Sequence, residues 1–319
     1  MRCVYCQVLR CNACKISPFY GLDFDDALFS ELTIEAVPPE KRIELVKDLS
    51  ISGVQQKYSL VFQEDSGKLI MRNRGGQFIL KPEIKDDRFV NSLFSVENEH
   101  ISMRLTEKMG LNTALNCIVT LGGDDLGYVT KRFDYIDEDT SYLMGDFGQV
   151  MAIDATGIGK YNPTVEEMGR ALDQRLGASL VLKAELFRRV VANFILCNGD
   201  AHVKNYSLIQ NRIDDDTRVF SPVYDVMNTI IHIPGGRESA LGLTNDTRDQ
   251  KYGLTRESFD ALASRLGLRI RARNSTYSTL LRRMDNYEVS LFKYYPGMNH
   301  EIRNQYIDLV DERLNVIRK

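Results

Sequence analysis

The sequence predicts an α+β protein of two lobes, a β-rich N-terminal lobe and a helical C-terminal lobe. Between residues 58 and 133, short segments of alternating polarity are separated by turns rich in glycine and aspartate. Beyond about residue 136, apolar residues recur at helical spacing over longer stretches. The chain has 319 residues, 43% of them hydrophobic and 27% charged, so it can bury a substantial core. We place a cysteine-rich segment at 1–24, the N-terminal lobe at 25–135 and the helical lobe at 136–319.

The N-terminal lobe is expected to contain two helices and a series of strands. Pro38-Pro39 favours a helix start and predicts a helix at Glu40–Lys47. A second, amphipathic helix at Ser92–Met109 is closed by Gly110. The expected strands are Tyr58–Gln63, Lys68–Asn73, Gln77–Lys81, Asn116–Leu121 and Gly127–Phe133.

The helical lobe is expected to begin with two helices. Thr164–Leu176 follows an Asn-Pro pair, and Leu182–Cys197 has a wide apolar face. A hairpin is expected around Asp214–Asp216, where a solvated turn explains the three aspartates better than a cation site. Three further helices are expected from there to the C-terminus. The apolar face of the second helix consists of Leu186, Phe187, Val190, Val191, Phe194 and Ile195.

Charge and hydropathy restrict the class of protein. Lysine and arginine (41) nearly balance aspartate and glutamate (44), and the pI is near 5.9. Such a surface carries no overall signature of nucleic-acid binding. No apolar run approaches the length of about eighteen residues that a membrane helix needs, and the N-terminus lacks the apolar core of a signal peptide. We expect a cytoplasmic protein that binds neither nucleic acid nor membranes directly.

Four of the six cysteines lie near the N-terminus, in the order Cys3-x2-Cys6-x4-Cys11-x2-Cys14. In a reducing compartment, paired CxxC motifs favour a tetrahedral Zn2+ over disulfides, although the four-residue gap is tighter than in zinc ribbons. The alternatives are an oxidisable terminus without fixed structure, a single bound CxxC motif, or an iron–sulfur cluster. The remaining two cysteines, Cys117 and Cys197, lie in apolar surroundings and are expected to be small buried hydrophobic residues.

The octapeptide NGDAHVKN at 198–205 is the strongest functional signal in the chain. Asp200 and Asn205 stand five positions apart, the spacing at which protein kinases place a catalytic base and a metal-binding amide. Asp225, in the segment SPVYD, adds a second hard oxygen ligand for Mg2+. A carboxylate beside an acceptor hydroxyl can take its proton. The alternative is an Asx turn, because Asn-Gly-Asp is good turn chemistry in its own right.

A lysine and a glutamate of the N-terminal lobe form a second candidate pair. Lys81 ends the strand FILKP, although an isolated lysine there is more often a solvated edge charge. The helix that follows contains VENEH, and a glutamate on an inward stripe of this helix needs a cation. Lys81 would provide it, as in the kinase lysine–glutamate pair. Helical spacing does not choose between Glu97 and Glu99.

Two further features belong to the candidate site. The loop at 49–57 contains only Gly53, so it is neither a GxGxxG loop nor a Walker A sequence. Its interest lies in its serines and in its place before the first strand. Within the octapeptide we expect Lys204 to assist phosphate transfer, whereas His202 and Asn198 support the loop. Together these features indicate a two-lobed, protein-kinase-like fold.

With these residues assembled, the chain resembles the HipA-like serine/threonine kinases of bacterial toxin–antitoxin systems, and within them the compact HipT branch. The matching segments follow the family order across most of residues 45–231. They are SISGVQQKYSL (50–60), FILKPE (78–83), VENEH (96–100), KRFD (131–134), DFGQ (146–149), NGDAHVKNYSL (198–208) and SPVYDV (221–226).

The resemblance implies roles for the residues at matching positions. Asp200 would be the catalytic base, and Asn205 and Asp225 would be magnesium ligands. Lys81 would anchor the phosphates of ATP, and Glu99 falls on the Asn-Glu of the family pattern.

The resemblance also implies further ATP contacts and a means of control. The Ser-Ile-Ser loop resembles the autophosphorylation motif of the HipT branch, which makes Ser50 and Ser52 candidate phosphosites. A phosphate on either serine would oppose ATP binding through charge repulsion. The further residues implied at the ATP site are Gly53, Lys131, Phe133 and Asp134. Lys131 and Phe133 would offer backbone groups to adenine, and Asp134 would reach the ribose.

The function implied is that of an ATP- and Mg2+-dependent protein kinase, the toxin of a toxin–antitoxin module. Its substrate would be an aminoacyl-tRNA synthetase, whose phosphorylation inhibits translation. Its partners would be a DNA-binding HipB-like antitoxin and a small HipS-like protein. Two alternatives stay open: a small-molecule kinase of related fold, and a catalytically silent binding protein that acts with its antitoxin.

Overall fold

The computed structural model describes residues 55–63, 68–72, 75–121, 125–137, 140–177, 179–212, 215–294 and 298–319. The helix predicted at 40–47, the cysteine cluster at 3–14 and the loop residues Ser50, Ser52 and Gly53 lie outside these ranges. The chain divides into two compact units. The first runs through Ile101 and includes Ala114–Ser141 and Glu288–Met298, and the second comprises Ser102–Thr113, Tyr142–Tyr287 and Asn299–Lys319.

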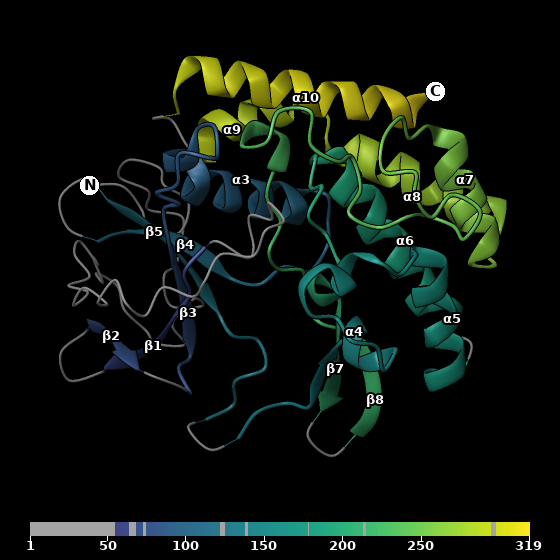
Figure 1. Cartoon of the computed structure of the whole chain (residues 1–319), viewed down its shortest axis with the longest axis horizontal. Coiled ribbons are helices and arrows are strands. Elements are labelled where there is room, and N and C mark those ends of the chain that lie inside the picture. The colour runs from purple at the N-terminus through teal and green to yellow at the C-terminus, as the bar shows by residue number, and fades with distance from the viewer. Residues whose placement is uncertain are drawn as a thin grey trace. The chain divides into compact units, whose positions relative to one another are not determined.

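An antiparallel sheet of five strands forms the first unit, in the order β2-β1-β3-β5-β4 (Figure 1). The strands predicted from alternating polarity are confirmed, with ends that differ by at most two residues. They are β1 (Tyr58–Gln63), β2 (Lys68–Arg72), β3 (Phe78–Pro82), β4 (Asn116–Thr120) and β5 (Leu126–Lys131).

Alternate residues of these strands form the core of the first unit, because successive side chains of a strand point to opposite faces. Leu80 on β3 pairs with Val129 on β5, and both are fully buried. Cys117 is buried in the same cluster, as predicted for a small hydrophobic residue. The cluster consists of Leu60, Phe62, Leu69, Phe78, Leu80, Cys117, Val119 and Val129.

The helix predicted at 92–109 forms as a short 3-10 turn (Ser92–Phe94) followed by α3 (Ser95–Lys108). Gly110 ends it with φ of +82°, a left-handed conformation that glycine adopts without steric strain. Near the start of α3, the buried ring of His100 contacts Oδ1 of Asn116 on β4 at 2.8 Å. This contact joins the first part of α3 to the sheet of the first unit.

The second unit is mainly helical and is organised around α6 (Leu180–Ile195), which contacts α5 (Val165–Leu176) and three helices of the C-terminal part (Figure 1). The apolar face predicted for this helix is buried. Phe187 is fully buried and meets Tyr277 edge-on, with ring centroids 5.7 Å apart. Burying a side chain of this kind contributes about 1.5–3 kcal/mol.

Beyond residue 255 the described chain forms four helices where three were expected. They are α7 (Arg256–Arg265), α8 (Ile270–Arg283), α9 (Tyr287–Tyr294) and α10 (His300–Arg318). Asn286 has φ of +54° and interrupts the helical path between α8 and α9, a conformation that asparagine tolerates better than most residues. No helix within the described ranges is long and apolar enough to cross a membrane.

A three-stranded sheet, β6-β7-β8, completes the second unit. The predicted hairpin forms from β7 (Ser207–Arg212) and β8 (Asp215–Phe220). The sequence did not indicate β6 (Met144–Asp146), because three residues are too few to show an alternating pattern. It leads into the single-turn helix α4 (Phe147–Val150), which begins with a capping box between Asp146 and Gln149.

Candidate active site

The loop at 198–205 is held by backbone geometry that few residue types allow. Cys197 follows α6 with φ of +56°, a left-handed conformation. At Gly199 an added Cβ would lie 2.0 Å from the carbonyl oxygen of Arg237, nearer than side-chain atoms ever come. The hydroxyl of Thr229 accepts from the Gly199 N–H at 2.9 Å and donates to the Cys197 carbonyl at 3.1 Å. The glycine of NGD is therefore a steric requirement of the turn that presents the next residue, an aspartate.

Asn205 and Asp225 lie side by side. Nδ2 of Asn205 donates to Oδ2 of Asp225 at 3.0 Å, and Oδ1 of Asn205 accepts from the backbone N–H of His202 at 3.0 Å. Asp225 has φ of +62°, which is uncommon for a residue with a side chain and typical of constrained functional positions. Asn198 also contacts this residue, with Nδ2 3.4 Å from the Asp225 carbonyl oxygen. An amide and a carboxylate are thus brought together from separate segments.

Asp200 lies in the same loop between two side-chain contacts. Its N–H donates to Oδ1 of Asn198 at 3.3 Å, and its Oδ1 accepts a hydrogen bond from the hydroxyl of Tyr161. The neighbouring His202 is buried, with 4% of its surface exposed. Burial lowers the pKa of His202 to about 4, so its ring is neutral at pH 7. A neutral, buried ring suits support of the loop better than binding of a phosphate.

Lys204 points away from its loop toward α4. Its Nζ lies 2.8 Å from Oδ2 of Asp146, the residue that caps α4, and almost half of the lysine side chain is exposed. The Lys204 carbonyl accepts from the hydroxyl of Tyr224 at 2.7 Å. The predicted helper is therefore a half-exposed cation paired with the aspartate of the DFGQ segment.

In the first unit, Lys81 pairs with Glu99. Nζ lies 2.5 Å from Oε1, and the two side chains are 5% and 1% exposed. Helical spacing had left Glu97 and Glu99 equally suited to this contact, and the structure places Glu99 against the lysine. A buried lysine and glutamate in hydrogen-bond contact is the arrangement with which kinases hold nucleotide phosphates.

The predicted adenine-binding segment lies at the end of β5. The N–H of Lys131 donates to the Leu115 carbonyl at 2.9 Å, so this N–H is already used within the sheet. Burial lowers the pKa of the Lys131 ammonium. Asp134, predicted to reach the ribose, accepts two hydrogen bonds from Arg132, at 3.1 Å from Nε and 2.6 Å from Nη2. The structure thus assigns the Asp134 carboxylate a protein partner.

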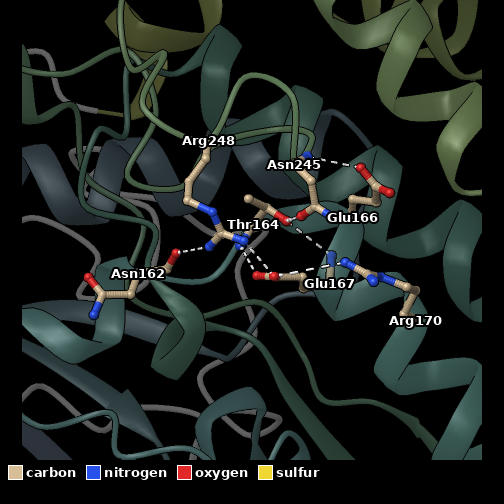
Figure 2. Close-up of polar contacts among 7 residues, drawn as sticks. All are labelled: Asn162, Thr164, Glu166, Glu167, Arg170, Asn245 and Arg248. Atoms are coloured by element: carbon tan, nitrogen blue, oxygen red, sulfur yellow. Dashed lines mark hydrogen bonds and ion pairs between the residues drawn. The ribbon is translucent and has the colours of Figure 1, made fainter.

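The segment after Asp225 is fastened to the start of α5 by a polar network (Figure 2). Thr164 caps α5 and donates to Oδ1 of Asn245 at 2.8 Å. Glu167 completes the capping box and accepts from Nη2 of Arg248 at 2.5 Å. Arg248 also donates to the carbonyl of Asn162 at 2.7 Å. The segment at 245–248 is thereby attached to the start of α5, although the two are about 80 residues apart in sequence.

Sequence reasoning missed several residues that contact the loop, among them Thr229, Tyr161 and Arg237. Tyr161 bonds Asp200 from the end of the 3-10 helix Gly157–Tyr161, and Arg237 approaches Gly199 through its carbonyl. Neither belongs to a recognisable motif, so no pattern in the sequence marks them. They become visible only once the chain is folded.

The donor set of the loop fits magnesium. Mg2+ is commonly held by one or two carboxylates, with water and substrate phosphates in the remaining positions. Asp225 provides a carboxylate and Asn205 an amide oxygen. The two side chains meet through Nδ2 of Asn205, while its amide oxygen accepts from the His202 N–H. Among the described residues no group of three or more His, Cys, Asp or Glu is arranged to hold a metal. The cysteines predicted to bind zinc lie outside those residues.

These features define a class of protein: an α+β chain of the protein-kinase-like fold, with the base and metal-binding amide spacing of a kinase loop. Residues 49–287 match the HipA-like C-terminal domain family, so the chain belongs to this family. The resemblance to HipA-like proteins inferred from the motifs is thereby confirmed.

Named relatives agree with this assignment. A putative kinase of Haemophilus influenzae is 27% identical over 209 residues, which cover 63% of this chain and 57% of the relative. The putative kinase Y4dM of Sinorhizobium fredii is 30% identical over 235 residues, covering 69% of this chain and 54% of the relative. The chain therefore spans about half the length of these curated relatives.

A solved structure shares the fold. The HipA of Shewanella oneidensis, determined in a toxin–antitoxin complex with HipB and operator DNA, superposes with a TM-score of 0.67 at 20% identity. The match covers 88% of this chain and 67% of that protein. The predicted fold class is confirmed.

Proposed function

We propose that this chain is an ATP- and Mg2+-dependent protein serine/threonine kinase, the toxin of a cytoplasmic toxin–antitoxin module. The observation that carries the proposal is the 3.0 Å contact between Asn205 and Asp225, in the same loop system as Asp200. Phosphoryl transfer requires positioning and charge neutralisation more than covalent chemistry from the protein. This loop supplies a base and two hard oxygen ligands, which are the groups that the reaction needs.

Each residue then has a defined task in the second unit. Asn205 and Asp225 hold the magnesium, which neutralises charge on the nucleotide phosphates when it is bound. Asp200 orients the acceptor hydroxyl and takes its proton. Lys204, half exposed and paired with Asp146, lends positive charge to the transferred phosphate. His202 is neutral and buried, and therefore holds the loop.

In the first unit, Lys81 anchors nucleotide phosphates and Glu99 orients it. Backbone groups of Phe133 and the carbonyl of Lys131 would contact the adenine, because the Lys131 N–H is already bonded to Leu115. Asp134 reaches a ribose only if it leaves Arg132. Gly53, which lies outside the described residues, would contact the phosphates.

Membership of the family supports the biological role that we propose. The Shewanella HipA binds HipB at operator DNA, which supports a HipB-like DNA-binding antitoxin as partner here. We further propose a small HipS-like partner, an aminoacyl-tRNA synthetase as substrate, and autophosphorylation of Ser50 or Ser52 as an off switch. Zinc at Cys3, Cys6, Cys11 and Cys14 is proposed separately, and elemental analysis finding less than about a tenth of an equivalent would contradict it.

Phosphorylation by the purified chain tests the proposal. The chain is first treated with a phosphatase, because a phosphoserine already present would mask activity, and is then incubated with Mg-ATP and a bacterial lysate. Mass spectrometry should find new phosphate on serine in the wild type and none with Asp200→Ala. Asp173→Ala is the matched control, because Asp173 pairs with Lys183 at 2.6 Å on α5 and α6 and has no predicted role. Equal phosphate in wild type and Asp200→Ala, or label confined to small metabolites, would contradict the proposal.

A further inference from the structure

Tyr161 contacts the predicted catalytic base directly. It ends the 3-10 helix Gly157–Tyr161, and its hydroxyl donates a hydrogen bond to Oδ1 of Asp200. The two residues are separated by 39 positions, and both belong to the second unit. A hydrogen bond to a carboxylate is charge-assisted and directional, so it restricts the rotation of that carboxylate.

Three neighbours hold the ring of Tyr161. The His202 ring meets it edge-on, with centroids 5.3 Å apart and planes at 74°. The guanidinium of Arg237 lies 5.2 Å from the ring centroid, and the Lys160 ammonium lies 5.1 Å from it. Cations above an aromatic face are attracted to it, and the edge contact fixes the rotation of the ring. These contacts restrict the movement of the Tyr161 side chain.

The segment that contains Arg237 is itself held by contacts with other parts of the second unit. The Arg237 carbonyl lies where a Cβ on Gly199 would clash, so this segment and the loop carrying Asp200 are in close contact. The next residue, Glu238, pairs with Arg313 of α10 at 2.9 Å and accepts from the Leu254 N–H at 2.8 Å. Contacts thus extend from α10 through this segment, in which Glu238 is partly buried and Arg237 is exposed, to the tyrosine.

We infer that Tyr161 is a positioning residue: it holds the Asp200 carboxylate in the orientation that receives the acceptor proton. This rests on the proposed kinase function. In the transfer, the acceptor oxygen forms a bond to the γ-phosphorus, the bond from that phosphorus to the bridging oxygen of ADP breaks, and the acceptor proton passes to Asp200.

In the opposite role, the Tyr161 hydroxyl would fill the position where the hydroxyl of the substrate must bind. Tyr161 would then have to move away before the substrate could bind. The contacts with His202, Arg237 and Lys160 oppose such a movement, and they favour a ring that stays in place during the reaction. The two roles predict opposite effects when the hydroxyl is removed.

Tyr161→Phe tests the inference because it removes the hydroxyl and keeps the ring contacts. With labelled Mg-ATP and a lysate as phosphate acceptor, the rate at saturating ATP should fall by roughly 10- to 100-fold, the loss expected when a catalytic group is misplaced. The KM for ATP should stay within about twofold, because Tyr161 acts on the acceptor proton only. An unchanged or higher rate would overturn the positioning role.

Tyr277→Phe is a matched control in the same unit. Its hydroxyl donates to Oδ1 of Asp260 at 2.9 Å, and an arginine, Arg256, lies 4.5 Å from its ring centroid. The substitution removes the same kind of hydrogen bond far along the chain from the loop, and the rate should not change. A second comparison uses Asp200→Asn: adding Tyr161→Phe to it should lower the rate no further. If the double variant instead shows the product of the two single rate losses, Tyr161 acts through general stability, and this result would contradict the inference.

Tyrosine labelled with 13C at Cζ separates this inference from the proposed function. The Tyr161 resonance, assigned by its loss in Tyr161→Phe, should shift in Asp200→Asn and stay in place in Asp260→Asn, and the Tyr277 resonance should do the reverse. If the Tyr161 resonance does not shift in Asp200→Asn, the inference is overturned, whether or not the chain transfers phosphate. A wild type that transfers no phosphate, with the expected shifts present, contradicts the kinase function and leaves the positioning of Asp200 supported.

Discussion

Lys81 and Glu99 form a buried ion pair, with Nζ 2.5 Å from Oε1 and almost no exposed surface on either side chain. The ring of Tyr128 on β5 lies beside the lysine, its centroid 5.5 Å from Nζ. Removing two charges from water costs several kcal/mol for each, so each charge in this pair depends on its partner. The pair therefore contributes to the fold of the first unit as well as to the nucleotide binding that we propose.

Breaking this pair from one side should destabilise the chain. Lys81→Met leaves the Glu99 carboxylate buried without its cation, and the free energy of unfolding should fall by about 3–5 kcal/mol. Adding Glu99→Leu should recover much of this loss, because no lone charge then stays buried. Urea denaturation monitored by circular dichroism measures both changes. The exposed pair of Lys85 and Asp125, 2.7 Å apart, is the control, and Asp125→Asn should cost less than about 1 kcal/mol.

Gly199→Ala should damage both stability and activity. The new Cβ would lie 2.0 Å from the Arg237 carbonyl oxygen, and neither backbone can move without displacing the loop of Asp200. Overpacking of this kind costs about 1–3 kcal/mol, measured as a shift in the denaturation midpoint. Gly145→Ala is the comparison, because its Cβ would make only ordinary contact with Gln149 at 3.6 Å. Equal stability of the two variants would show that the turn tolerates a side chain.

Glu83 should make stability depend on pH. Burial, followed by the charges of Glu97 and Asp125, raises its pKa from 4.5 to about 7. Between these two values the folded chain keeps a proton that the unfolded chain has released. Stability therefore falls as the pH rises through this window, and the ionised side chain opposes folding above it.

Glu83→Gln should remove this dependence. Because Glu83 is partly exposed, solvent screening limits the expected gain to about 1 kcal/mol near pH 8, with none near pH 5. Thermal unfolding at the two pH values measures it. Glu301→Gln, at an exposed position in the first turn of α10, should change stability equally at both. A gain for Glu83→Gln that is larger near pH 5 would contradict the assignment.

Arg248→Leu should loosen the segment after Asp225. It removes the bonds to Glu167 and to the Asn162 carbonyl, while the contact between the Asn245 N–H and Glu166 remains (Figure 2). Hydrogen exchange of the backbone amides at 242–248 should become faster, because local opening loses two of its restraining bonds. Arg170→Leu is the control: this arginine also faces Glu167, but at 3.8 Å and half exposed, and its removal should leave exchange unchanged.

Much of the fold follows from local pattern. Alternating polarity located β1 to β5, and helical spacing located α3, α5 and α6, because these signals need only neighbours in sequence. The octapeptide marked the loop of Asp200 and Asn205 for the same reason. Two features were not predicted, because neither produces a pattern in the sequence. The strand β6 has only three residues, and the break between α8 and α9 depends on the left-handed conformation of one residue, Asn286.

By itself, the sequence determined most of the elements, the order of the motifs and which residues are candidates for the kinase-like site. Only the tertiary structure decided which groups touch: Glu99 in place of Glu97 against Lys81, Arg132 against Asp134, and Tyr161 against Asp200. A pattern reads residues a few positions apart, whereas the contact between Tyr161 and Asp200 spans 39 positions. Such contacts form only when packing and burial select one arrangement among the many that a local pattern allows.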